Sequence, residues 1–438
     1  MRRRRVVVTG AGVVCSLGST VDALWHGLLD GRSGIAPVTR FDPARFHSRL
    51  AGEVDDAEVT LSPGPYAFEF KRMSAFVRYA LFAADRAVED SGLTGEACDG
   101  PVGEAYSGLV GEAYGGGSAA RVGPDLPSGG AVYLGVAMGG LPSIEAGVLK
   151  QERRGVRKTS PFLIPSLIPN MAASAIALRH GIADEQMTIA GACASGCQAV
   201  GEAMRAIRSG DRTWALAGGA EAVTTPVTYS GFQAMMALSR GEDPAGTPRP
   251  FDRRRDGMVV GEGAAVFVLE DGAHAEARGA EVYGELVGYA TNSGCDDLTG
   301  ISTPHVVRCM DGALADAGVA PDAVDCVYAQ ASGMVRGDAA ELAAVRELLT
   351  GAERQPVVTS IKGHTGYMFA ANGPMNLAAA LMALRHQTVS PTLKYEQSDP
   401  AFSGVDIAGE ARKTELRRCL INAFGFGGIN ASLIVSRV

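Results

Sequence analysis

One short stretch of the chain, residues 188–196, restricts the fold more than any other. It reads TIAGACASG, so an apolar run ends in glycine and alanine around Cys193, and a helical pattern follows from Gln198. This order predicts a strand, a tight turn and a helix, as in an α/β protein. The turn would place the Cys193 thiol at the start of the helix, where the helix dipole favours a thiolate. The alternative interpretation is a buried structural cysteine.

Strands and helices alternate on both sides of this stretch. The apolar runs that predict strands lie at 6–10, 131–136, 215–222, 261–270, 283–289, 326–329, 356–359, 419–422 and 431–436. The helical patterns between them include 76–92, 306–317, 339–348 and 374–386. Two similar α/β halves, residues 1–272 and 273–438, therefore indicate a duplicated fold with a site at their junction.

A glycine-rich segment, residues 94–130, interrupts the first half. The run GEAYSG at 103–108 nearly repeats as GEAYGG at 111–116. A run of this kind has no apolar pattern of its own, so we expect a flexible surface insertion.

Composition and charge narrow the classes of function. The chain has 438 residues and a net charge of −8, so it lacks the excess of basic residues that is typical of nucleic-acid-binding proteins. No apolar run approaches the roughly 18 residues that span a membrane, and the arginines at 2–5 lead into a run too short for a signal peptide. The eight cysteines are scattered and lack the spacing of a metal or redox motif. The sequence predicts a reduced, cytoplasmic protein without a metal, nucleic acid or membrane partner.

The first predicted strand ends in Gly10 and Gly12, which invites comparison with a dinucleotide-binding turn. That turn requires a third glycine at position 15, where this chain has Cys15. No acidic residue follows a second strand at the required distance either. The sequence therefore argues against bound NAD, and we expect no bound cofactor.

Eight motifs lie in register along nearly the whole chain. They are RVVVTG at 5–10, SPF at 160–162, NMAA at 170–173, ACASG at 192–196, GGAEA at 218–222, RPFD at 249–252, GEG at 261–263 and FGFGGIN at 424–430. Together they resemble the β-ketoacyl-(acyl carrier protein) synthases, the condensing enzymes that include type II polyketide ketosynthases. The resemblance implies the thiolase fold, five layers in the order α-β-α-β-α, which agrees with the two duplicated halves.

The resemblance also implies roles for the matching residues. Cys193 corresponds to the nucleophile that accepts the acyl chain as a thioester. The backbone N–H groups of Cys193 and Phe426 correspond to the oxyanion hole, and the Phe426 ring corresponds to the gate over the acyl pocket. Fixed N–H donors of this kind contribute about 3 kcal/mol each in other acyl-transfer enzymes.

The chain departs from the family at both catalytic histidines. Counting back from the Asp-x-x-Glu motif at 338–341 puts Gln330 at the first position, and counting five residues on from Lys362 puts Tyr367 at the second. Asn376 stands where a glutamate normally helps to hold the lysine. In the family, the histidines hold the malonyl thioester carbonyl and support decarboxylation. Gln330 and Tyr367 can donate hydrogen bonds, but neither is a routine substitute for imidazole near neutral pH.

His364 is a histidine close to these positions, three residues before Tyr367. It has two interpretations, a displaced replacement for a catalytic histidine or a solvated loop residue. The second is favoured because solvated loop histidines are the commoner case.

Three functions are compatible with these residues. In the first, Cys193 takes an acyl chain and a step without decarboxylation follows, such as aldol, lactone or lactam cyclisation or acyl transfer, with Tyr367, Lys362 or Gln330 orienting or deprotonating the chain. In the second, the protein still condenses malonyl units. In the third, it is a non-catalytic partner subunit like a chain-length factor, and such subunits usually lack the cysteine. The complete turn around Cys193 favours the first function.

Four further positions correspond to the substrate cleft of the family. Ser332 and Met334 stand where two threonines contact the phosphopantetheine arm, so one hydroxyl is kept. Met258 stands where the family often has phenylalanine, and Ile429 where it often has threonine. These changes predict a reshaped cleft and a specialised substrate, as in secondary (polyketide-type) metabolism rather than fatty acid synthesis.

An acyl carrier protein is the partner that the resemblance implies, with its phosphopantetheine arm as substrate carrier. Carrier proteins are acidic, so an enzyme of net negative charge needs a local basic patch. The family's docking segment contains Lys71, Arg72 and Arg78 here, with a solvated helix face as the alternative. For a second basic cluster at 150–158 a solvated helix face is favoured. We expect a homodimer, with a heterodimer with another ketosynthase as the alternative.

Overall fold

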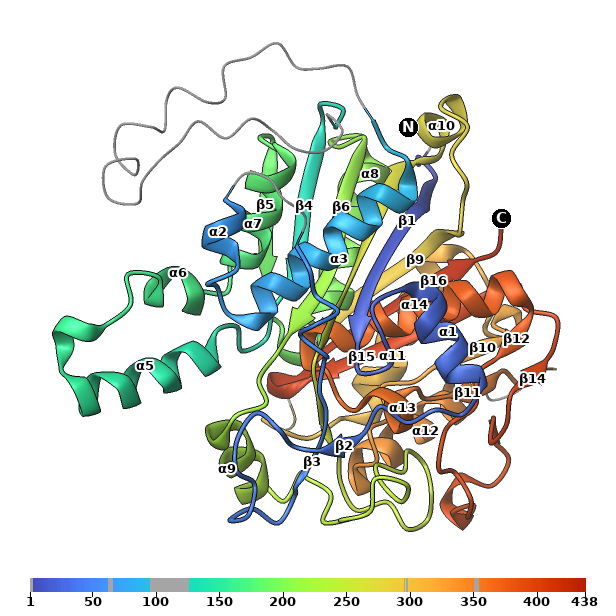
Figure 1. Cartoon of the computed structure of the whole chain (residues 1–438). Helices are drawn as coiled ribbons and strands as arrows, with labels where there is room; N and C mark the ends of the chain where they lie inside the picture. The colour runs from blue at the N-terminus through green and yellow to red at the C-terminus, as the bar shows by residue number, and fades with distance from the viewer. Residues whose placement is uncertain (1–2, 62–65, 95–125, 295, 297, 350–353) are drawn as a thin grey trace.

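The computed structural model describes residues 3–61, 66–94, 126–294, 296, 298–349 and 354–438. The glycine-rich insertion predicted at 94–130 falls mainly on residues 95–125, which lie outside the described residues. Helices and strands alternate from β1 (Val6–Cys15) to β16 (Ile429–Ser436) (Figure 1).

The two halves of the chain repeat one order of elements. The first half runs β1, α3 (Ala75–Ser91), β4 (Gly130–Gly135), α7 (Met171–His180), β5 (Glu185–Ile189), α8 (Ser195–Ser209), β6 (Trp214–Glu221) and β8 (Gly263–Asp271). The second half runs β9 (Gly284–Ser293), α11 (Thr303–Ala317), β10 (Cys326–Tyr328), α12 (Val335–Leu348), β11 (Val357–Thr359), α14 (Asn372–His386), β15 (Arg418–Gly425) and β16.

Equivalent strands occupy equivalent places in the two sheets. The order is β5-β4-β6-β8-β1 in the first half and β11-β10-β15-β16-β9 in the second. In both, the first three strands are parallel and the later pairs are antiparallel. The duplicated α/β fold is therefore confirmed, while the boundary between residues 272 and 273 stays a prediction.

The two sheets meet edge to edge. Val6–Val8 of β1 pair antiparallel with Gly284–Leu286 of β9. This contact merges the sheets into one eleven-stranded sheet, with β13 (Asp406–Ile407) added outside β11.

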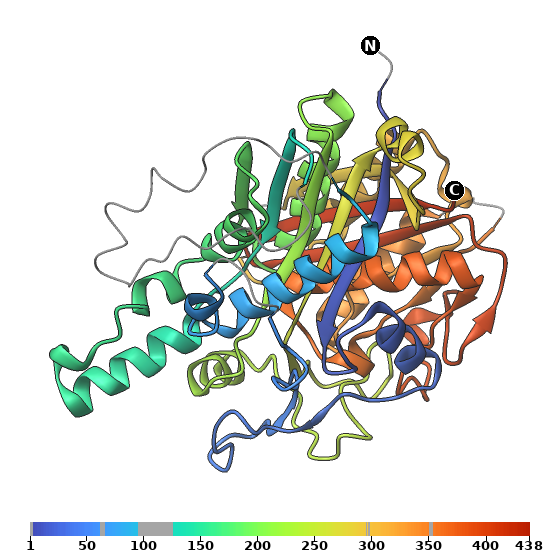
Figure 2. The same ribbon diagram turned by 45° about the horizontal axis from the view of Figure 1, so that its top comes forward.

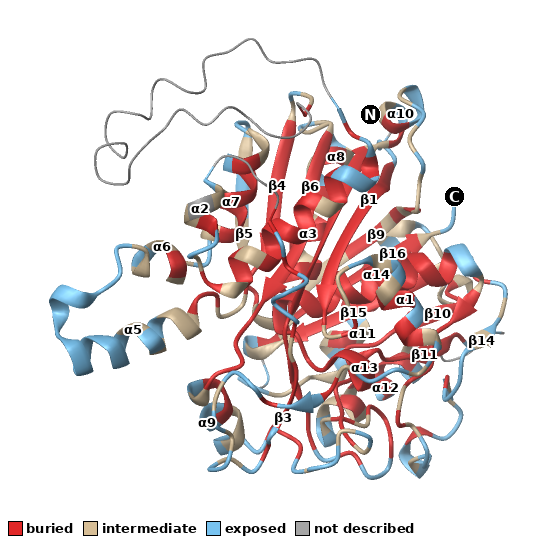
Figure 3. Cartoon of the chain, viewed as in Figure 1, coloured by how far each residue is buried: buried red, intermediate tan, exposed pale blue. Residues whose placement is uncertain are grey.

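Helices complete five layers around these sheets (Figures 1 and 2). α8 and α14 pack against each other between the sheets, α3 and α7 cover the outer face of the first half, and α11 and α12 cover that of the second. α14 is buried from Asn372 to Leu384 because it is apolar around almost its whole circumference. Figure 3 shows the central strands and α14 as buried and the projecting helix α5 (Leu141–Arg154) as largely exposed. The predicted α-β-α-β-α order is confirmed.

Shorter elements surround this core. They are α1 (Val21–Leu29), β2 (Ala36–Pro37), β3 (Leu50–Gly52), α2 (Ala67–Phe70), α6 (Leu163–Leu167), α9 (Pro226–Ala234), β7 (Val260–Gly261), α10 (Gly272–Ala277), α13 (Lys362–Thr365), β12 (Thr388–Val389) and β14 (Arg412–Lys413). Across the described residues, no helix is both long and apolar enough to cross a membrane.

Two glycines let the Cys193 turn approach its neighbours. A Cβ on Gly135, at the end of β4, would lie 2.3 Å from the backbone nitrogen of Gly196. A Cβ on Gly196 would lie 2.2 Å from the carbonyl oxygen of Ala370. Because the opposing atoms are backbone, no side-chain rotation can relieve these contacts, and only glycine fits at either position.

The variant Gly135→Ala tests this close approach. The added Cβ must displace the start of α8, so the free energy of unfolding should fall by about 1–3 kcal/mol, as for other overpacked cores. Gly231→Ala in α9 is the matched control, because a Cβ there meets nothing within 4 Å. The control should keep its stability or gain about 1 kcal/mol from helix propensity. Urea unfolding measures both, and equal stability of the two variants would contradict the close approach.

Candidate active site

The turn that carries Cys193 has the predicted order of elements. β5 ends at Ile189, residues Ala192–Ala194 form a 3₁₀ turn, and α8 begins at Ser195. Ala192 has a φ of +48°, a left-handed conformation that is uncommon for alanine. The Ser195 hydroxyl accepts a hydrogen bond from the Gly191 N–H at 2.9 Å and donates one to the Ala192 carbonyl at 2.5 Å. Ser195 therefore holds the turn in this conformation.

Cys193 is half-buried and packs against an apolar cluster that includes Met258, Tyr367 and Phe369. The pKa of its thiol is raised to about 12, chiefly by burial; a hydrogen bond with Tyr367 opposes this rise and the buried carboxyl of Glu221 adds to it. The thiol is therefore protonated near neutral pH in the free protein. The sequence predicts that the helix end favours a thiolate, but burial outweighs that effect here.

Gln330 and Tyr367 form a hydrogen-bond chain that ends at the sulfur. Both are buried, with 4% and 6% of their surface exposed. The Gln330 Nε2 donates to the Phe424 carbonyl oxygen at 3.0 Å and to the Tyr367 hydroxyl, which is hydrogen-bonded to Cys193. Burial holds the pKa of Tyr367 well above its usual value, so the phenol stays neutral and is a donor to the sulfur rather than a base.

Two carboxylates of α12 hold the backbone around Gln330. Glu341 accepts the N–H groups of Gln330 and Ala331, each at 2.9 Å. Asp338 accepts those of Ser332 and Gly333, each at 3.1 Å. Both carboxylates lie on one face of the helix because they are three residues apart. Burial raises the pKa of Asp338 to about 6 and also raises that of Glu341.

Lys362 is fully buried beside this loop. Its Nζ donates to the Ala329 carbonyl at 2.7 Å and to the Asn376 Oδ1 at 2.9 Å. The amide of Asn376 supplies an acceptor without a negative charge, and burial lowers the pKa of Lys362 to about 7. These contacts support the backbone next to Gln330.

His364 fits neither interpretation made from the sequence. It is fully buried, its Nδ1 lies 2.8 Å from the Arg32 carbonyl oxygen, and its Nε2 lies 3.1 Å from that of Pro391. Burial lowers its pKa to about 4. His364 is therefore a structural residue packed between these two carbonyls, and its neutral ring donates its one N–H to one of them.

The Phe426 segment lies against the Cys193 turn. A Cβ on Gly425 would be 3.0 Å from the Cys193 backbone nitrogen. The half-buried Phe426 ring lies 6.3 Å from that of Phe232 in α9, which stacks on Phe369 at 5.3 Å. Phe369 in turn contacts the Tyr367 ring at 5.2 Å. The aromatic contacts thus connect the predicted gate residue to Tyr367. No motif in the sequence indicated a role for Phe232.

The four predicted cleft residues do not all lie together. Met258 and Met334 pack in the same apolar cluster as Cys193. Ser332 lies on the loop that Asp338 holds and is 6% exposed. Ile429 instead packs against the core around α8 and α14.

The three predicted docking residues differ in their exposure to solvent. Lys71 and Arg72 are exposed, and the Arg72 guanidinium lies 5.6 Å from the centre of the Phe162 ring. Arg78 is half-buried and pairs with Asp56 at 3.2 Å. Its charge is therefore partly neutralised within the chain.

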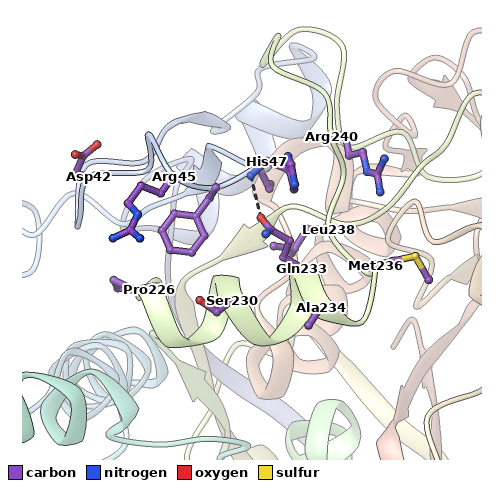
Figure 4. Close-up of a pocket in the computed structure, with 12 residues that line it drawn as sticks. Asp42, Arg45, His47, Pro226, Ser230, Gln233, Ala234, Met236, Leu238 and Arg240 are labelled. Atoms are coloured by element: carbon purple, nitrogen blue, oxygen red, sulfur yellow. Dashed lines mark hydrogen bonds between the residues drawn. The ribbon is translucent and has the colours of Figure 1, made fainter.

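A pocket of about 750 Å³ lies between the loop at 42–48 and α9 (Figure 4). Arg45 and His47 come from the loop, and Gln233 of α9 accepts a hydrogen bond from the His47 N–H at 2.9 Å. Phe232 on the same helix contacts Phe369 and Phe426. No residue predicted for the catalytic site lines this pocket.

In the part of the chain that the structure describes, no group of three or more His, Cys, Asp or Glu could hold a metal ion.

Comparisons with known proteins agree with this fold. Residues 3–275 match the family model described as beta-ketoacyl synthase, N-terminal domain, and residues 283–396 match the corresponding C-terminal domain. The chain belongs to the beta-ketoacyl synthase family. The predicted family resemblance and its thiolase-type fold are thus confirmed.

Two kinds of relative are similar to this chain, a 3-oxoacyl-[acyl-carrier-protein] synthase and ketosynthases of polyketide type. The chain is 34% identical over 441 residues to 3-oxoacyl-[acyl-carrier-protein] synthase 2 of Coxiella burnetii, with 100% of both chains covered. A type II polyketide acyl-carrier protein in complex with its ketosynthase, bound to the hexaketide, is similar at a TM-score of 0.85 and 27% identity. The ishigamide ketosynthase/chain length factor is similar at 0.85 and 29%. Both structural matches cover 100% of each chain.

The reactivity of Cys193 should reveal its protonated state. Only the thiolate reacts with iodoacetamide, so alkylation should be slow at pH 7 and accelerate about tenfold per pH unit up to pH 9. Tyr367→Phe removes the hydrogen bond that lowers the thiol pKa, so the variant should react more slowly at each pH. Peptide mass spectrometry measures the rate at Cys193. A rate that reaches a plateau below pH 8 would contradict a protonated thiol.

The Lys362–Asn376 contact makes a second prediction, about stability. Lys362 has a folded pKa near 7, below its ordinary value of 10.5, so the unfolded chain binds more protons between these pH values. Stability therefore rises with pH above about 7. Asn376→Asp places a negative charge beside the Lys362 amine, which raises the pKa of the lysine. The increase of stability with pH should therefore be smaller in this variant.

Melting temperatures at pH 7, 8 and 9 measure the slope. Lys362→Met, which keeps the length of the side chain and does not titrate, gives the reference slope without this lysine. Lys394, whose pKa burial also lowers to about 7, contributes equally to all three proteins. If wild type and Asn376→Asp share one slope, the proposed state of Lys362 is wrong.

Proposed function

We propose that this protein is a ketosynthase-like acyltransferase of secondary, polyketide-type metabolism. It accepts an acyl chain from an acyl carrier protein as a thioester on Cys193. A step without decarboxylation follows, either an intramolecular cyclisation or an acyl transfer. The observation that supports this most directly is the Gln330–Tyr367–Cys193 hydrogen-bond chain, in which both partner residues stand where the family has histidines.

The acylation step uses groups that surround the turn. The Cys193 sulfur bonds to the acyl carbon, the bond from that carbon to the pantetheine sulfur breaks, and the thiol proton passes to the pantetheine sulfur. The Tyr367 hydroxyl donates to the attacking sulfur and lowers its pKa. The N–H groups of Cys193 and Phe426 are proposed to hold the developing oxyanion, each contributing about 3 kcal/mol.

The hydrogen-bond donors that decarboxylation of a malonyl thioester requires are already used within this protein. A glutamine side chain has two N–H groups. In Gln330 these go to the Phe424 carbonyl and the Tyr367 hydroxyl, so neither remains for a malonyl thioester carbonyl. Condensation of malonyl units by Gln330 and Tyr367 is therefore the less supported alternative.

Carrier docking and pairing complete the proposal. Lys71 and Arg72 are the exposed members of the predicted docking segment, and Arg78 would contribute least because Asp56 pairs with it. The relative that binds a type II acyl-carrier protein supports a carrier partner. β5 is one of the two edge strands of the sheet. Exposed apolar residues lie on β5 and on the helices that precede it in the chain: Met187 on β5, Ile144, Val148 and Leu149 on α5, Ile164 on α6 and Leu178 on α7. The free strand edge and these apolar residues support a homodimer.

A non-catalytic role in a heterodimer is the second candidate. It is favoured by one observation, the similarity to the ishigamide ketosynthase/chain length factor. The retained cysteine turn favours catalysis instead. Acylation of Cys193 separates the two, because a purely structural subunit does not need it.

Acyl loading and malonyl decarboxylation test the proposal together. Incubation with acyl-carrier protein should add the acyl mass to wild type but not to Cys193→Ala. Malonyl-carrier protein should release little CO₂, with or without an acyl primer. The double variant Gln330→His/Tyr367→His should increase that release by about 10²-fold, the usual contribution of a positioned acid–base group.

Each result decides one part of the proposal. Unchanged activity in Cys193→Ala overturns the acyl-Cys193 intermediate. Rapid malonyl decarboxylation by the wild type favours the condensing alternative. Absence of any mass gain at Cys193 favours the partner-subunit role.

A further inference from the structure

The orientation of the Gln330 amide is fixed by the Phe424 carbonyl. A carbonyl oxygen only accepts hydrogen bonds, so the amide atom that faces it at 3.0 Å must be the nitrogen. The same nitrogen faces the Tyr367 hydroxyl. The tyrosine oxygen is therefore an acceptor in this contact, and its proton is directed to the Cys193 sulfur, with which it is hydrogen-bonded.

The other amide atom, Gln330 Oε1, has no hydrogen-bond partner among the described residues, although the side chain is only 4% exposed. It shares a carbon atom with Nε2, and Nε2 reaches the sulfur through one hydroxyl group. Oε1 therefore belongs to a side chain that is linked to the reacting thiol through the Tyr367 hydroxyl. Buried polar atoms are almost always paired, and an orphan on a side chain linked to the thiol points to a ligand group that pairs with it.

We propose that Gln330 Oε1 receives an O–H or N–H group of the second reactant, so that this reactant is an alcohol or an amine. The inference rests on the acyl-Cys193 intermediate of the proposed function and names the reactant that follows it. The product is an ester or amide, or a lactone or lactam when the donor lies on the acyl chain itself.

The polarity of the site excludes a malonyl thioester at this position. Its carbonyl and its carboxylate present only acceptor oxygens, and either would face the Gln330 oxygen without a proton between them. A hydroxyl or amine supplies that proton and places its own oxygen or nitrogen near the acyl carbon. One atom of Gln330 therefore selects between carbon–carbon bond formation and transfer to a heteroatom.

The transfer step balances without a further reactant. The oxygen or nitrogen of the reactant bonds to the acyl carbon, and the bond from that carbon to the Cys193 sulfur breaks. As the oxygen or nitrogen of the reactant bonds to the acyl carbon, its proton leaves the hydrogen bond to Gln330 Oε1 and passes to the Tyr367 hydroxyl, which gives its own proton to the departing sulfur. The cysteine returns to the neutral thiol that the free protein holds, with its pKa near 12.

A competition between nucleophiles tests this inference. Cys193 is first loaded from octanoyl-N-acetylcysteamine, and the loaded protein is divided among 1-hexanol, hexylamine, malonyl-N-acetylcysteamine and buffer. Intact-protein mass spectrometry follows loss of the octanoyl group, and chromatography identifies hexyl octanoate or N-hexyloctanamide. Hexanol or hexylamine should unload the wild type at least about tenfold faster than malonyl-N-acetylcysteamine or water, the scale of one well-placed hydrogen bond.

Two variants make the role of Gln330 specific. Gln330→Met keeps the length of the side chain and removes the acceptor. Unloading by hexanol or hexylamine, measured on protein already loaded, should slow about tenfold relative to unloading by water. Gln330→His offers an N–H donor and should shift the preference towards malonyl-N-acetylcysteamine. A merely structural role for Gln330 would slow all acceptors alike and leave the preference unchanged.

The outcomes separate this inference from the proposed function. Normal loading with no preference for alcohol or amine, or with the same preference in Gln330→Met, overturns the inference alone. Failure of Cys193 to load in a correctly folded wild type overturns the proposed function, and the inference with it. A thermal unfolding curve of each variant confirms that it is folded before kinetics are compared.

Discussion

The backbone contact between the Cys193 turn and residues 369–371 is the constraint on which the site depends. Gly196 follows the nucleophile in the first half of the chain, and Ala370 belongs to the second half. Ala370 lies three residues after Tyr367, so this one contact fixes the sulfur relative to the hydroxyl that binds it. Gly135 presses on the turn from the sheet side. The two halves of the duplicated fold thus build one site, because glycine permits close backbone contact where the halves meet.

Buried charge supports the same site from the other side. Asp338 and Glu341 accept the backbone N–H groups of the loop that carries Gln330. Their carboxylates are costly to bury, which is why their pKa values rise. Lys362 is equally buried, and its partner Asn376 brings no charge. Burying these groups costs stability. The cost is consistent with a loop, the one that carries Gln330, whose position is needed for the site.

Much of the fold followed from the sequence because strand and helix periods are local properties. The alternation of elements indicated the duplication, and counting from Lys362 placed Tyr367 beside Cys193, where it lies. Long-range contacts were not predictable in this way. The carbonyl partners of His364 come from Arg32 and Pro391, the partner of Arg78 is Asp56, and the high thiol pKa arises from burial. The direction of the Gln330 amide depends on the Phe424 carbonyl, which no side-chain pattern reveals.

The neutral thiol of Cys193 has a consequence for the resting protein. Thiolates attack peroxide and disulfides, so a cysteine that keeps its proton near neutral pH resists conversion to sulfenic acid or to a mixed disulfide. Burial therefore protects Cys193 from oxidation in the resting protein. In the proposed function it reacts with an acyl thioester, which supplies both the electrophilic carbon and the sulfur that takes the thiol proton.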